Sequence, residues 1–286
     1  MIALTAIVVA ATLAATNASP AKLPTDVPGL VQYMARDDFA GQAAAAELVK
    51  RGKNVVTELL PSLKDPAPRV RYWSAAALCR MADERAYQPL LDTLRTDTHP
   101  IVRATILWHL QHFKKDETFE LARQHLNDAD PLLRGWAIKV LANGQRRDRL
   151  ADIVALTTDK DPGVRNDALV AAVQLAGNGH FGLIKQLATK DSDPHVREGA
   201  LRCLTLLPEK KPMIIGVMIR ALSDPSPDVQ TAAATLLAKG TNQSFGFDPA
   251  RPRREREHAI AQWQKWYEAN QSRLHWDAKL HRFEAK

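Results

Sequence analysis

The sequence predicts an all-α protein, a right-handed α-α superhelix of about seven helix pairs. A seven-residue pattern of Asp, two variable residues, Pro, one variable residue, an aliphatic residue and Arg occupies residues 65–71 and returns four times complete. A sixth copy ends in Gln230, and the last positions of successive copies lie 32, 31, 31, 32 and 33 residues apart. Such a period is typical of stacked helical repeats, in which each repeat packs only on its neighbours.

Each copy of the pattern marks the start of a helix. Proline fits the first helical position, because its fixed φ suits a helix and its missing N–H has no helical partner there. The residue before the proline is a good N-cap in four copies: Asp130, Asp161, Asp193 and Ser226. After Arg165, the residues Ala168, Leu169 and Ala172 follow a 3.6-residue period. We therefore predict a first helix from each copy and a second helix after a short turn.

The predicted second helices align at a spacing of 31 residues. One aligned position is apolar in every repeat, at Leu60, Leu91, Ala122, Ile153, Ile184 and Ile215. Two neighbouring columns are each interrupted once, by Asp152 and by His125. Local exposure or a shift of register would explain both exceptions, and a functional pair is the alternative.

We expect four parts along the chain: a signal peptide over residues 1–18, a linker over 19–28, the repeats over 29–240, and a closing unit over 241–286. An apolar run covers residues 2–15 and is followed by the small residues Thr16 and Ala18. The run is short for a membrane span. No Lys or Arg precedes it, so a retained anchor or an ordinary apolar tail stay open. If it is cleaved, the mature chain is exported, periplasmic or extracellular, without a membrane span; otherwise the protein is cytoplasmic.

Both ends of the repeat region depart from the pattern. In the first repeat, Gly41 stands where the Arg belongs. After the last repeat we expect an insertion over 241–252, a helix from Arg254 to Asn270, and a hairpin that turns at Ala278-Lys279. Terminal repeats are atypical because one side has no neighbour. The tryptophans of this unit would seal the apolar end of the stack as an aromatic C-terminal cap.

The repeated Asp and Arg resemble the short HEAT-like repeat, of the type found in phycobilisome lyase subunits, over residues 38–240. The Phe245-Gly246-Phe247-Asp248 segment, followed by Trp263-Gln264-Lys265-Trp266, is similar to the C-terminal end of exported bacterial HEAT-repeat proteins. The resemblance implies a structural ladder in which each Arg bonds the Asp of an adjoining repeat, and in which Gln230 loses an ionic rung. The ladder residues would be Asp65, Arg71, Asp97, Arg103, Asp128, Arg134, Asp159, Arg165, Asp191 and Arg197.

The sequence offers no candidate for catalysis or for a cofactor. It has no HExxH motif, no glycine-rich phosphate loop and no Gly-x-Ser-x-Gly elbow. Cys79 and Cys203 lie four repeats apart in apolar helical runs, which favours buried thiols. His109 and His112 could share a metal, but no third ligand has a suitable spacing. We therefore predict a protein that is not an enzyme and that binds no metal or cofactor.

The formal charge argues against a nucleic-acid partner. It is +7, and residues 251–286 contribute +4 of it, from nine Lys and Arg against five Asp and Glu. The repeats themselves therefore carry only a small excess of positive charge. The basic run at Arg251–Arg256 alternates with Glu, as in a solvated helix start.

The helical wheel predicts two surfaces. Positions two and five after the ladder Arg point away from the buried side of the first helices, and they hold Trp73, Trp108 and Trp136. We expect these rings on the convex side, as an interaction patch or lying flat on neighbouring helices. The opposite, concave side would present mixed polar residues of the second helices: Glu58, Asp92, Glu120, Arg123, Gln124, Lys185 and Gln186.

These observations predict a monomeric, non-catalytic protein-interaction scaffold that binds another protein or peptide through the concave groove, the convex Trp patch, or both. The alternatives are a nucleic-acid-binding helical-repeat protein and a lyase-like enzyme subunit. The predicted partner-binding residues are Trp73, Trp108, Trp136, Asp92, Arg123, Gln124, Lys185 and Gln186.

Overall fold

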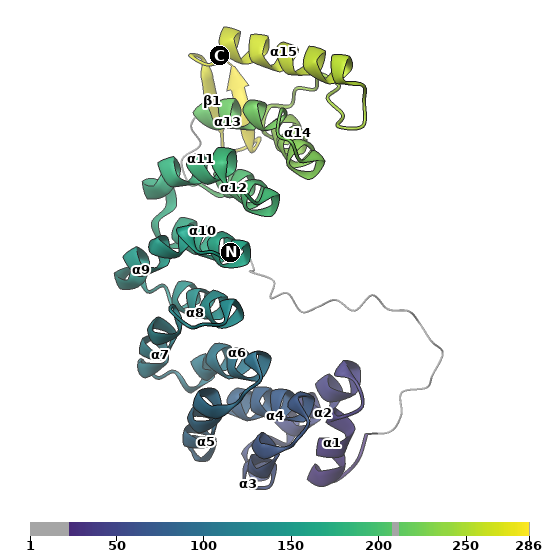
Figure 1. The fold of residues 1–286 in the computed structure, drawn as a ribbon, viewed down its shortest axis with the longest axis vertical. Helices are drawn as coiled ribbons and strands as arrows, with labels where there is room; N and C mark the ends of the chain where they lie inside the picture. Colours follow the sequence, from purple (N-terminus) through teal and green to yellow (C-terminus); the bar gives the residue numbers. More distant parts are fainter. Residues whose placement is uncertain (1–22, 208–211, 286) are drawn as a thin grey trace.

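The structure, a computed structural model, describes residues 23–207 and 212–285 (Figure 1). The predicted signal peptide and residues 19–22 of the predicted linker lie outside the described residues. Helices dominate the described part, with one small hairpin near its C-terminal end. The protein is an all-α superhelix, as the repeat period predicts.

Most repeats consist of two antiparallel helices. The first helices are α2 (Asp38–Arg51), α4 (Pro68–Met81), α6 (Pro100–His109), α8 (Pro131–Asn143), α10 (Pro162–Ala176), α12 (Pro194–Leu206) and α14 (Pro227–Thr241). The second helices are α3 (Val56–Leu59), α5 (Glu84–Thr96), α7 (Glu117–His125), α9 (Leu150–Ala155), α11 (Phe181–Lys190), α13 (Met213–Ala221) and α15 (Arg253–Asn270). A further helix, α1 (Val27–Met34), packs beside α2.

The repeated pattern sets the turn that precedes each first helix. The ladder Asp accepts a hydrogen bond from the backbone N–H two residues further on, as Asp159 does from Asp161 at 2.8 Å. Asp161 in turn caps α10 by accepting from the N–H of Val164 at 3.0 Å. Pro162 then occupies the first helical position. The same few residues therefore close one helix and start the next, which explains why the pattern recurs so regularly.

The two helices of each pair form two layers, and the array bends (Figure 1). The first helices α4, α6, α8, α10 and α12 lie on the inside of the bend, and α5, α7, α9 and α11 lie along its outside. Each first helix packs closely on the next, whereas α5, α7 and α9 have few contacts with one another. Helices on the inside of a curved stack are the more crowded ones. The predicted assignment of faces is therefore wrong: the first helices line the concave side, and the second helices line the convex side.

The second helix of the first repeat is broken. Short 3-10 segments, Gly52–Val55 and Leu60–Lys64, flank the single α-helical turn of α3. Gly52 has a φ of 71° in the left-handed region, and Pro61 lacks the N–H that a continuing helix would need. The first repeat is thus irregular, as expected for a terminal repeat.

An aromatic cap closes the C-terminal end. Trp263 of α15 is 2% exposed and contacts the rings of Phe245 and Trp266 edge-on. Strands β1 (Leu274–Asp277) and β2 (Arg282–Ala285) form an antiparallel hairpin that packs on α14. The predicted two-residue turn at Ala278-Lys279 is wrong, because Asp277 pairs with Arg282 and the turn spans residues 278–281. Asp277 accepts from the N–H groups of Lys279 and Leu280, which stabilises this longer turn.

Candidate interaction surfaces

The predicted ladder residues lie together at the turns between repeats. Arg134 bonds Asp159 of the next repeat through Nε and Nη2, at 2.8 and 2.7 Å. Its Nη1 donates to the carbonyl of Asp128, the ladder Asp of its own repeat, at 2.9 Å. Arg71, Arg165 and Arg197 repeat this arrangement with Asp97, Asp191 and Asp224. Each guanidinium thus joins two repeats, and the hydrogen bonds that Arg134 donates to Asp159 raise the pKa of Arg134.

One rung is different, and the difference explains His125. Arg103 reaches Asp128 through Nη2 alone, at 2.8 Å, while its Nε donates to the carbonyl of Leu94. His125 Nδ1 lies 3.0 Å from the same oxygen of Asp128. The polar residue in an apolar column therefore belongs to the ladder.

The other polar exception, Asp152, is exposed on α9. The structure does not bring it together with His125 as a pair.

The ladder ends at the last repeat. Gln230 donates to the carbonyl of Asp224 at 2.6 Å, which replaces the bond that the ladder Arg makes within its own repeat. Its amide oxygen accepts a 3.4 Å bond from Arg256 of α15 instead of an ion pair. The ionic rung is absent at Gln230 among the described residues, where the stack gives way to the cap.

The three predicted tryptophans lie on the inner layer, half-buried between neighbouring first helices. Trp108 of α6 and Trp136 of α8 contact each other, with ring centroids 5.2 Å apart. Trp73 of α4 packs on Gly41 of α2 and on Tyr72. The rings therefore lie on neighbouring helices, and their remaining exposed edges contribute to the concave surface.

Gly41 provides the space for Trp73. A Cβ at position 41 would lie 2.0 Å from Trp73 Nε1. We expect Gly41→Ala to lower the free energy of unfolding by about 1–3 kcal/mol and to shift the Trp73 emission, because the ring must move. Urea denaturation followed by fluorescence measures both. Gly182→Ala in α11 is the control, since a Cβ there meets nothing within 4 Å, and its free energy of unfolding should stay equal or rise. Equal effects of the two variants would contradict this packing.

Exposed apolar side chains accompany the tryptophans. Phe39, Ile101 and Leu132 are 75%, 45% and 38% exposed. They stand two residues before the ladder position, at the starts of α2, α6 and α8. At 100° per residue, this position and the two tryptophan positions fall within about 60° of one another on the helix. We call Phe39, Ile101 and Leu132 the apolar row of the inner face.

The inner face changes character towards the C-terminal end. The positions that correspond to the apolar row are His195 in α12 and Asp228 in α14. Between these two helices, a hollow of about 370 Å³ is lined by Glu198, Arg202 and Thr235, among others. Of the four large exposed apolar side chains on the described first helices, three lie on α2–α8 and the fourth is Leu206 of α12.

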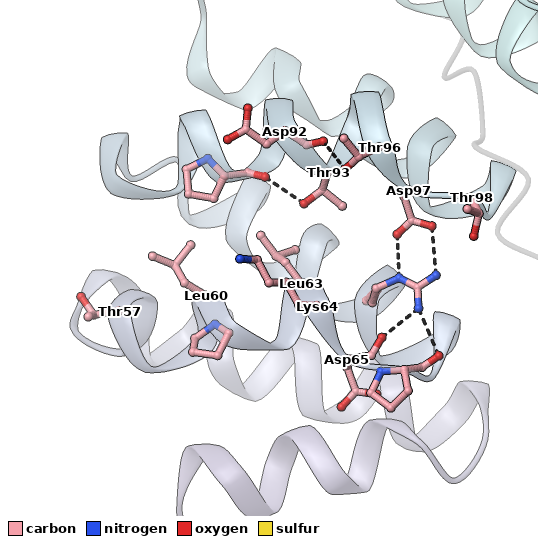
Figure 2. Close-up of a pocket in the computed structure, with 14 residues that line it drawn as sticks. Thr57, Leu60, Leu63, Lys64, Asp65, Asp92, Thr93, Thr96, Asp97 and Thr98 are labelled. Atoms are coloured by element: carbon pink, nitrogen blue, oxygen red, sulfur yellow. Dashed lines mark hydrogen bonds and ion pairs between the residues drawn. The ribbon is translucent and has the colours of Figure 1, made fainter.

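The convex side carries a groove between the first two second helices (Figure 2). Its volume is about 860 Å³, and the broken helix around Leu60 and Pro61 forms one wall while Pro89 and Thr93 of α5 form the other. The hydroxyl of Thr93 donates to the carbonyl of Pro89, and the Arg71–Asp97 rung closes one end. The irregular first repeat opens this space.

The predicted polar partner-binding residues are spread along the convex side. Asp92 of α5 lines the groove and accepts from Gln88. Arg123 of α7 pairs with Glu120, while Gln124, Lys185 and Gln186 are exposed on α7 and α11. Asp92 lines the convex groove, and the structure does not gather the others with it. The sequence did not reveal the apolar row, although its two-residue offset from the ladder was a usable signal.

His109 and His112 stack at the ends of α6 and the following turn. Nδ1 of His109 lies 3.4 Å from Nε2 of His112. Burial, then the neighbouring His112, then Arg80 hold the pKa of His109 down at about 4. The same cation lowers the pKa of His112, although burial is the larger cause there. The positive charge of Arg80 would repel a metal cation at these two histidines.

Other chemistry is limited in the described part of the chain. Residues 23–207 and 212–285 contain no cluster of three or more His, Cys, Asp or Glu that could hold a metal ion. Cys79 and Cys203 are buried free thiols, and burial raises the pKa of Cys203 to about 12. A search of the same residues finds no helix with the length and hydropathy of a membrane span.

Comparison with known proteins identifies the repeat. The family model for HEAT repeats matches residues 27–111. Beyond that segment, the same Asp–Arg ladder continues to Asp224. The chain is therefore a HEAT-like repeat protein. No curated protein matches it.

Several solved structures are similar over much of the chain. The complex of CpcE and CpcF of phycocyanin lyase from Nostoc sp. PCC7120 is 16% identical, with 88% of this chain and 98% of that chain covered and a TM-score of 0.44. An engineered protein is 18% identical, with coverage of 83% and 71% and a TM-score of 0.39. A second engineered protein is also 18% identical, with coverage of 75% and 96% and a TM-score of 0.33. The low identities and TM-scores of these structures carry no evidence about the function of this chain.

Proposed function

We propose that this chain is a non-catalytic protein-interaction scaffold that holds a partner polypeptide on its inner face. HEAT repeats generally mediate protein interactions. The observation that carries the proposal is the apolar row of Phe39, Ile101 and Leu132, exposed beside half-buried tryptophans on the concave side. Exposed apolar clusters of this kind often mark protein interfaces. Export and a monomeric state remain predictions from the sequence.

The proposal is tested by capture of partners from the native host with variants of each face. Phe39→Ser, Ile101→Ser and Leu132→Ser, combined, remove the apolar row with little effect on folding, because all three side chains are exposed. We expect this variant to lose the proteins that the wild type retains. The control combines Gln124→Ser, Lys185→Ser and Gln186→Ser on the convex side, and it should retain them. Loss with the control and retention with the apolar-row variant would place binding on the other face.

A further inference from the structure

The inner face of α2–α8 has two unlike edges. The apolar row lies near the N-terminal ends of α2, α6 and α8, and the same position in α4 is Arg69, which pairs with Asp38. The exposed cations Lys50 and Arg80 lie near the C-terminal ends of α2 and α4, nine residues after the ladder position. His112 holds the next place in this row, after α6. The ninth residue after the ladder position lies at 180° around the helix, and the apolar row, two residues before that position, lies at about 160°. Both rows therefore share the surface that carries the tryptophans. We call Lys50 and Arg80 the cationic row; His112, whose pKa is lowered, is not counted as a cation.

Unpaired positive charge lies near the C-terminal ends of α2 and α4. Three nearby carboxylates have cationic partners: Asp38 pairs with Arg69, Glu47 with Arg51 and Asp167 with Lys139. Asp37 instead caps α2. Lys50 and Arg80 have no ion-pair partner within the described residues. Arg80 also lies close enough to His109 and His112 to lower the pKa of both.

Helix geometry alone does not account for the cationic row. A cation near a helix C-terminus is favoured by the helix dipole, which would suit every first helix equally. The equivalent positions in α8, α10 and α12 are nevertheless Asn143, Gln174 and Leu206, while α14 has Lys239. Three of the first helices lack a cation here, so the fold does not require one at this position.

We propose that the inner face of α2–α8 binds an acidic amphipathic segment of a partner protein, with its apolar side on Phe39, Ile101 and Leu132 and its carboxylates along Lys50 and Arg80. This inference rests on the proposed function and narrows the class of partner. Four neighbouring helices at about 8–10 Å spacing give a surface roughly 25–30 Å long. A helical segment of about 17–20 residues has this length at 1.5 Å per residue.

A displayed peptide library tests the charge of the occupant. Each member has 18 residues, with Leu at an amphipathic helical spacing and either Glu or Lys at each remaining position. Selection on the full chain, after removal of members that bind the Phe39→Ser, Ile101→Ser and Leu132→Ser variant, should enrich Glu along one flank of the Leu stripe. Enrichment of Lys, an even mixture, or no selectable binder would overturn the proposal.

Charge reversal then locates the contact. For the acidic peptide that the selection yields, we expect Lys50→Glu with Arg80→Glu to weaken binding at least tenfold in fluorescence anisotropy. The same variant should bind the matching Lys peptide more tightly than the wild type does. Lys185→Glu with Lys190→Glu, on exposed positions of α11, is the control and should leave the affinity unchanged. An unchanged affinity for the reversed inner face would contradict the proposal.

Host capture with the two inner-face variants distinguishes a non-acidic partner from the absence of a partner on this face. If the apolar-row variant loses the captured host proteins while Lys50→Glu with Arg80→Glu retains them, the inner face binds partners that are not acidic. If both variants retain them, the proposed function fails as well.

Discussion

Asp159→Ala is expected to lower the free energy of unfolding by about 3–5 kcal/mol, because it leaves Arg134 buried without its carboxylate. Arg134 is 5% exposed and bonds Asp159 twice, at 2.8 and 2.7 Å. The same substitution also removes the acceptor for the N–H of Asp161. Urea denaturation monitored by circular dichroism measures the loss.

An exposed pair provides the matched control. Asp38 bonds Arg69 of the neighbouring repeat at 3.1 Å, but its side chain is 83% exposed. Solvent screens such a pair, so Asp38→Ala should cost less than about 1 kcal/mol. Arg134→Met combined with Asp159→Ala should cost less than Asp159→Ala alone, because no unpaired buried charge remains. Equal effects of Asp159→Ala and Asp38→Ala would refute the structural role of the ladder.

The second large effect is a loss of stability in mild acid. His109 has a folded pKa of about 4, below its ordinary value of 6.5, and burial is the main cause. Since protonation favours the unfolded chain, the neutral imidazole contributes its full stability above pH 6.5, and this contribution is lost as the pH falls towards 4. Each pKa unit corresponds to about 1.4 kcal/mol, so the loss between pH 7.5 and 4.5 should be about 2 kcal/mol after an allowance for partial exposure.

His109→Gln should remove most of this pH dependence. Its free energy of unfolding, measured in urea at pH 7.5, 6, 5 and 4.5, should change less than that of the wild type by about 2 kcal/mol. The carboxylate of Asp159 does not contribute in this range, since its pKa is lowered below 3.8 and its stabilisation is lost at still lower pH. His195→Gln, at an exposed position, controls for the loss of a histidine. Parallel curves for His109→Gln and the wild type would contradict the prediction.

The repeat period made the architecture predictable, because it depends on local rules. A proline at the helix start and an aspartate at the preceding turn act within a few residues, and the structure shows both in α10. The sequence could also predict which side of a first helix points away from its partner. These features follow from the chain's own geometry.

The face that each layer occupies could not be predicted in the same way. A helical wheel describes one helix, whereas the bend depends on how closely helices of different repeats approach one another. Glycine positions carried the missing signal. Gly41, Gly135 and Gly199 meet Trp73, Asp167 and Asn166 of the neighbouring first helices, where a Cβ would lie within 3 Å. Close approach in the layer of first helices places that layer on the inside.

Local rules also could not predict features that depend on contacts between two segments of the chain. His125 looked like an anomaly because its partner, Asp128, is one that the ladder had already assigned to Arg103. The convex groove depends on the broken helix around Pro61, which changes the wall that faces Pro89. Both features arise when two segments meet, and neither has a signature in one segment alone.

Site-specific photocrosslinking in the native host tests the central claim, that a partner protein lies on the inner face. A photoreactive residue at Ile101 on α6 reports on the concave side, and one at Gln124 on α7 reports on the convex side. Both positions are exposed, so both reagents can reach a bound protein. We expect a crosslinked partner with Ile101 and none with Gln124. A partner crosslinked through Gln124 and absent at Ile101 would contradict the account.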